Sequence, residues 1–176
     1  MDSYYLHAFE GEVVEYDVGS QRYVYTVVWL PESLHAALPL KAFPRLRVTG
    51  EMNEIEFASA LMPVPGATVP GSKGQRRWYL LLSKKQLQAM DAALGSVLRV
   101  RFRVDDQEAV DVPAVLASAL KANAQMRGLW EALTPGKQRG LAYRVASAKR
   151  AETQGKRVTE VFEILTGVRD ERGKRR

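Results

Sequence analysis

The period of the hydrophobic pattern changes near residue 110, and this change restricts the possible folds more than any other feature of the sequence. Residues 97–104, VLRVRFRV, alternate apolar and basic side chains, as in a strand with one buried face. From Pro113 onward the apolar residues recur every three or four positions, as on one face of a helix. We therefore expect an α+β protein, with a β-rich domain, a small barrel or a sandwich, in residues 1–110 and an all-helical domain in residues 111–168.

Six segments of the first domain are rich in the β-branched and aromatic residues that favour strands. They are residues 4–16, 22–30, 45–50, 55–61, 76–82 and 97–104. Before the last strand, Ser83 and Gln86 have the spacing of a capping box, and Gly95 suits the end of the helix that they begin.

The last of these strands predicts which side chains enter the barrel. Val100 and Phe102 should face the core, whereas Arg99, Arg101 and Arg103 should face water. We expect this arginine face to be a solvated exterior on which acidic residues of neighbouring strands pair with the arginines. The candidates for that pairing are Glu12, Glu15, Glu54 and Glu56.

The second domain has the pattern of four helices. They are expected at residues 113–123, at 124–133, from Thr134 toward Ala151, and between Gly155 and Gly167, with a turn near Gln154 and Gly155 before the last. The tail, residues 169–176, is dominated by charged residues and is expected to be disordered.

Residues 147–165, SAKRAETQGKRVTEVFEIL, carry the most informative polar pattern. The apolar stripe of the last helix should pack on the helix before it and turn two basic pairs toward the connecting turn. In that turn Thr153 should cap the last helix, and Glu152 should pair with a nearby cation. The surplus of positive charge predicts a site for an anionic group, on a protein partner or a nucleic-acid backbone. Its candidate binding residues are Lys149, Arg150, Glu152, Thr153, Lys156 and Arg157.

Residues 62–75, MPVPGATVPGSKGQ, share part of the phosphate-binding loop pattern. Gly66 to Lys73 read G-x-x-x-x-G-S-K, in which the last two residues do not follow the order of that motif. Pro70 removes an amide, and a strand rather than a helix is expected next. The segment is therefore interpreted as a long connecting loop, which could form the rim of a binding site.

The residue inventory argues against catalysis and metal binding. There is no cysteine, so a thiol nucleophile is excluded, and His7 and His35 are the only histidines. Neither a nucleophile elbow nor an H-E-x-x-H motif occurs. We therefore expect no enzyme activity, no catalytic residues, no metal and no cofactor.

The distribution of charge and apolar residues bears on partners and location. Residues 1–110 hold 12 basic and 13 acidic residues, a net charge of −1, whereas residues 111–176 hold 14 and 7, a net charge of +7. No apolar run is long enough for a membrane span, and the N-terminus lacks the pattern of a signal peptide. Together with the absence of cysteine, this predicts a cytoplasmic protein.

Residues 111–168 resemble the bacterial bacteriocin-protection, OmpD-associated family. The residues that carry the resemblance are Val112, Pro113, Ala119, Leu120, Trp130, Ala148, Lys149, Glu152, Thr153, Arg157 and Gly167. The chain differs from the family pattern at Arg144 and Val145 and at Gln154. The resemblance implies a role in resistance to bacteriocins, and it implies no set of catalytic residues.

The first domain is similar to a small β-barrel domain of unknown function that often precedes that helical domain. The similarity lies in Phe9 and in the stretches VVWLP, VTGEMNEIEF, SALMP, LLLSKKQLQAM and VRFRVDD. It implies a barrel similar to double-split barrels.

Three functions are compatible with these patterns. The chain could be a non-catalytic binding or stress-protection protein, a nucleic-acid-binding protein that uses its basic helical domain, or an enzyme. The expected partner is a protein or another anionic ligand, with nucleic acid as the alternative. The salt dependence of nucleic-acid binding would separate the first two functions.

Overall fold

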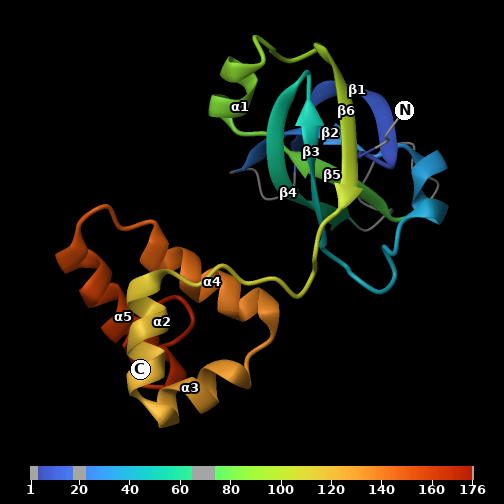
Figure 1. The fold of residues 1–176 in the computed structure, drawn as a ribbon. Helices are drawn as coiled ribbons and strands as arrows, with labels where there is room; N and C mark the ends of the chain where they lie inside the picture. The colour runs from blue at the N-terminus through green and yellow to red at the C-terminus, as the bar shows by residue number, and fades with distance from the viewer. Residues whose placement is uncertain (1–3, 18–22, 65–73, 176) are drawn as a thin grey trace. The chain divides into compact units, whose positions relative to one another are not determined.

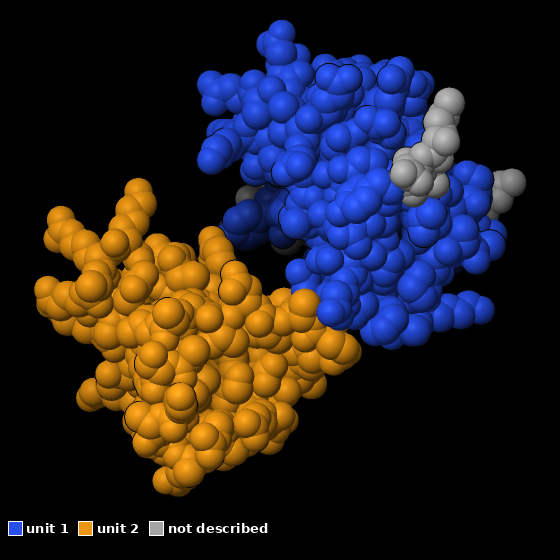
Figure 2. Space-filling view, in the orientation of Figure 1, with its two compact units in different colours: residues 1–107 blue, residues 108–176 orange. Residues whose placement is uncertain are grey.

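The computed structural model describes residues 4–17, 23–64 and 74–175, and it confirms the predicted α+β architecture (Figure 1). The chain forms two compact units, residues 1–107 and residues 108–176 (Figure 2). The sequence placed the boundary at residue 110.

The first unit is a closed barrel of six strands, in which every neighbouring pair is antiparallel. The strands are β1 (His7–Asp17), β2 (Val24–Trp29), β3 (Leu46–Met52), β4 (Ile55–Val64), β5 (Arg77–Leu81) and β6 (Val97–Val104). Around the barrel they follow the order β1, β2, β5, β4, β3, β6, with β6 returning to β1. Two short helices, η1 (Glu32–Ala37) and α1 (Lys84–Ala89), complete the unit.

Alternation along β6 builds the barrel core as predicted. Val100 and Phe102 are fully buried, and Phe102 lies edge-on to Phe9 with ring centroids 6.2 Å apart. Strand β3 passes so close to β6 that a Cβ on Gly50 would lie 2.0 Å from the Arg101 carbonyl oxygen. The glycine is thus required at this crossing, because any larger residue would force the two strands apart.

Arg99 and Arg101 of β6 face outward and pair with carboxylates, but not with the predicted ones. Arg103 is half-buried and contacts Tyr4, to whose hydroxyl it donates at 3.1 Å. Arg101 pairs with Glu51, and the Arg99 Nε lies 3.9 Å from Glu10 Oε1. The strand register explains both pairs, since Glu10 lies opposite Arg99 and Glu51 opposite Arg101. The prediction of Glu12, Glu15, Glu54 and Glu56 as partners was wrong because the register cannot be read from one strand alone.

Helix α1 begins at the predicted capping box but ends earlier than expected. The Ser83 hydroxyl accepts from the Gln86 amide, and the Gln86 side chain accepts from the Ser83 amide. The helix ends at Ala89, and Asp91 adopts a left-handed φ of 47° soon after it. Gly95, with a φ of 85°, belongs instead to the turn before β6.

The second unit consists of α2 (Ala114–Ala122), α3 (Ala124–Glu131), α4 (Pro135–Ala146) and α5 (Ala151–Leu165). Asn123 caps α3, accepting from the Met126 amide at 3.1 Å, and Thr134 caps α4. The buried core of the unit is formed by Leu116, Leu120, Met126, Trp130, Ala142, Val145, Val158 and Val161. Helices α4 and α5 pack as the predicted hairpin, although α4 ends five residues before Ala151.

The segment after α5 differs from the disordered tail that the sequence predicts. Residues 169–175, here called the C-terminal turn, fold back on themselves, and Arg169 and Arg175 form an antiparallel bridge. Gly173 permits the turn with a φ of 83°. Arg169 pairs with Glu163 of α5. This ion pair holds the charged segment against the helix, although the segment has few apolar side chains to bury.

Candidate functional site

The predicted binding residues lie together at the connection between α4 and α5, and they are here called the basic cluster. Lys149 and Arg150 lie in the turn itself, and both are exposed. Glu152, Thr153, Lys156 and Arg157 lie on the first two turns of α5 rather than before it. The sequence predicted the helix to begin after Gly155, and this was wrong because α5 begins at Ala151.

The earlier start of α5 changes the role of two residues. Arg150 is the N-cap residue, with the extended backbone that this position requires, and no side chain caps the helix. Thr153 therefore does not act as the cap that the sequence predicted. Instead, the Gln154 side chain donates to the Ala148 carbonyl at 3.0 Å and so ties the turn to the helix.

Two of the four cations in the basic cluster are neutralised within α5. Lys156 Nζ lies 2.6 Å from Glu152 Oε1, and Arg157 Nη1 lies 3.1 Å from Glu160 Oε2. Lys149 and Arg150 have no acidic partner among the residues that the structure describes. Free positive charge is therefore concentrated in the turn, directly before the helix.

The start of α5 adds a second source of positive potential. The first amides of a helix have no partner within the helix, and the helix dipole places partial positive charge at this end. Because α5 has no side-chain cap, these amides remain available to a ligand. The turn and the helix start together can bind an anion through backbone donors and two flanking cations.

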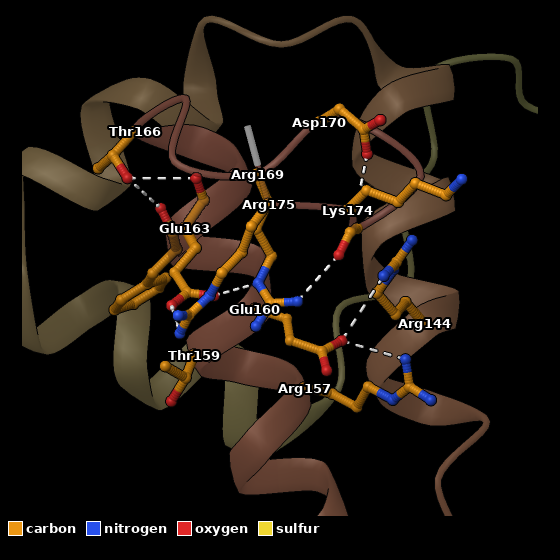
Figure 3. A network of polar contacts seen from close by, with 12 residues as sticks. Arg144, Arg157, Thr159, Glu160, Glu163, Thr166, Arg169, Asp170, Lys174 and Arg175 are labelled. Carbon is orange, nitrogen blue, oxygen red and sulfur yellow. Dashed lines mark hydrogen bonds and ion pairs between the residues drawn. The ribbon is translucent and has the colours of Figure 1, made fainter.

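A network of ion pairs joins α4, α5 and the C-terminal turn (Figure 3). Glu160 Oε2 lies between Arg157 and Arg144, at 3.1 and 3.5 Å, and Glu163 pairs with Arg169 and with Arg175 at 3.8 Å. Each glutamate therefore joins two arginines, and Glu163 attaches the C-terminal turn to α5.

The C-terminal turn also borders an open pocket of about 550 Å³ within the helical unit. Its wall is formed mainly by Leu129, Leu133, Leu141, Ile164 and Leu165, and Lys137, Arg144 and Glu171 lie at its polar side. The hydrogen bond from Lys137 lowers the pKa of the Glu171 carboxyl. Hydrogen bonding from the Lys174 amide lowers the pKa of Asp170 in the same way. This pocket was not predicted from the sequence, because the segment that borders it was expected to be disordered.

The remaining candidates from the sequence are placed as follows. The core of the loop 62–75 lies outside the described residues. His7 packs 5.2 Å from the Phe102 ring, and His35 lies edge-on to Trp78 at 5.0 Å. Burial lowers the pKa of His35, so the ring favours the neutral form.

In the part of the chain that the structure describes, no three His, Asp or Glu residues gather as a metal site would require. Among the same residues, no helix combines the length and apolarity of a membrane span.

Comparison with known proteins supports the resemblance of the helical unit. Residues 109–166 match the family described as Bacteriocin-protection, YdeI or OmpD-Associated. The match covers α2 to α5 and includes the whole basic cluster. No curated protein and no solved structure matches the chain. The helical unit of this protein is therefore similar to the bacteriocin-protection family.

Proposed function

We propose that this chain is a cytoplasmic, non-catalytic binding protein with a role in stress protection, and that its basic cluster captures an anionic group of a partner. The family matched by residues 109–166 supports protection as the biological role through its name. Support for a role without catalysis comes from the sequence, which has no cysteine and no recognised nucleophile or metal motif.

The observation that carries the proposal is the uncapped start of α5 behind two unpaired cations. A single charge at a helix start contributes about 0.3–1 kcal/mol, and a single exposed ion pair contributes a similar amount. Lys149, Arg150 and the helix amides together can supply a few kcal/mol to one anionic group. Such a contribution suits a docking contact that acts together with further contacts on the partner.

The test is capture of partners from the native cytosol by the full chain, with nuclease treatment as a control for nucleic acid. Lys149→Glu with Arg150→Glu should abolish capture. Reversing Arg157 as well is less informative, because a glutamate there would lie beside Glu160 and disturb the hairpin.

Lys121→Glu with Arg127→Glu is the matched control, because it reverses two exposed cations of the same helical unit and changes the net charge equally. Retention of the partners by the cluster variant would contradict the proposal. Equal loss in both variants would show that net charge alone attracts the partner.

Binding of nucleic acid is the alternative function, favoured by the net charge of +7 in residues 111–176. In that case capture should be lost after nuclease treatment. The logarithm of the binding constant should also fall steeply with the logarithm of salt concentration, since phosphate contacts release counterions. Capture that survives nuclease treatment would favour the protein partner.

A further inference from the structure

The pocket under the C-terminal turn lies at the end of the α4–α5 hairpin that is away from the basic cluster. It is lined by residues from α3, from α4, from the end of α5 and from the C-terminal turn. Its volume of about 550 Å³ falls in the range of small-molecule sites in proteins, roughly 300–1,000 Å³. The pocket is thus large enough for a ligand of modest size and is separate from the surface proposed to bind a partner.

The wall of the pocket is apolar and is left incompletely covered. Leu129 is exposed, and Leu141, Ile164 and Leu165 are half-buried. Gly140, in the middle of α4, also lines the pocket, and a Cβ built on it would have no atom within 4 Å. A larger side chain at this position can therefore extend into the pocket without a clash.

The polar side of the pocket already binds a carboxylate that belongs to the protein. Glu171 Oε1 lies 2.8 Å from Lys137 Nζ, and Arg144 Nη2 donates to the Glu171 carbonyl at 3.3 Å. The side chains of Lys137 and Glu171 are 55% and 76% exposed. A pair this exposed is weak and can exchange with another carboxylate.

The other carboxylates near the pocket are engaged elsewhere. Asp170 accepts from the Lys174 amide at 2.8 Å inside the C-terminal turn, and Glu160 and Glu163 are each shared by two arginines. Glu171 is therefore the carboxylate positioned to be displaced from Lys137.

We propose that this pocket binds a small amphipathic monocarboxylate. The apolar body of the ligand lies against Leu129, Leu141 and Ile164, and its carboxylate replaces the Glu171 carboxylate at Lys137. Glu171 acts as an internal competitor that occupies the cationic position when no ligand is bound. This site does not depend on the anion-binding role proposed for the basic cluster.

The first part of the test measures binding of hexanoate, octanoate, decanoate and phenylpropanoate to the full chain by calorimetry, with octanol as the uncharged control. At least one acid should bind saturably, and octanol should bind severalfold more weakly than octanoate. Glu171→Gln should bind the acid roughly two- to fivefold more tightly, the worth of an exposed ion pair. Lys137→Gln should weaken it, whereas Lys121→Gln, outside the pocket, should not.

The second part fills the pocket. Gly140→Leu should abolish binding of the acid, whereas Gly155→Leu, at another helix glycine with no neighbour within 4 Å of its Cβ, should leave it unchanged. Circular dichroism confirms that both variants remain folded. The proposal is overturned if no acid of the panel binds, if octanol binds as well as octanoate, or if Gly140→Leu binds like the wild type.

Discussion

Truncation of Phe102 should destabilise the barrel far more than truncation of its neighbour Arg101. The Phe102 side chain is fully buried in the barrel core and contacts the rings of Phe9 and His7. Removing a buried phenyl ring costs about 3–5 kcal/mol, because the lost contacts leave a cavity that closes only in part. Single domains have a total stability of about 5–15 kcal/mol, so the Phe102→Ala barrel should fold with a small margin.

Arg101→Ala removes an exposed side chain, which is 49% accessible and pairs with Glu51. Exposed ion pairs contribute about 0–1 kcal/mol. Glu51 is only 16% exposed, so the variant should lose about 1 kcal/mol, still well below the cost of Phe102→Ala. Urea unfolding followed through the amide NMR signals of residues 7–104 separates the barrel from the helical unit. Phe102→Ala should lower the barrel midpoint by at least about 1 M, and Arg101→Ala by much less. Equal midpoint shifts would refute the assignment of inward and outward faces on β6.

Three further predictions follow from the two units and their titrating groups. Burial lowers the pKa of His35, so the barrel should lose stability as the pH falls from about 6.5 toward the lowered value. His35→Phe should make the urea midpoint of the barrel depend less on pH over this range. An unchanged pH dependence would contradict the lowered pKa of His35. The lowered pKa values of Asp170 and Glu171 mean that both carboxylates stabilise the C-terminal turn above pH about 4. This contribution is lost as the pH falls through their folded values, and faster amide exchange in residues 169–175 would detect the loss. Limited proteolysis should cut between residues 105 and 113, which contain no helix or strand, and early cleavage within β6 or α5 would contradict the division into units.

Periodicity was sufficient to predict the strands, their buried faces and the helical character of the second unit, whereas the barrel was expected from the resemblance. It succeeded because each strand or helix buries only one face, so its apolar residues recur with the period of that element, as Val100 and Phe102 do in β6. The similarity of the first unit to double-split barrels stays a prediction, since no solved structure matches the chain.

The polar pairings were not predictable in the same way, because they depend on register and on helix ends. Glu51 and Arg101 are 50 residues apart in the chain, and they meet only because β3 pairs with β6. The start of α5 at Ala151 moved Thr153 out of the cap position, although the residues of the basic cluster remained together. The pocket was missed because Glu163 and Glu171 order a segment whose composition is typical of disorder.

The central claim, that the start of α5 and the two cations before it bind an anion, can be tested at the amides themselves. Tripolyphosphate is titrated into the full chain labelled with ¹⁵N, and the amide signals of residues 151–153 are followed. The account predicts that these signals move most and saturate, and that Lys149→Glu with Arg150→Glu weakens binding by about tenfold, equivalent to about 1.4 kcal/mol. Lys121→Glu with Arg127→Glu should change the affinity less than about twofold, since surface cations elsewhere add only screened, long-range attraction. Signals of residues 151–153 that stay unmoved, or an equal loss of affinity in both variants, would contradict the claim.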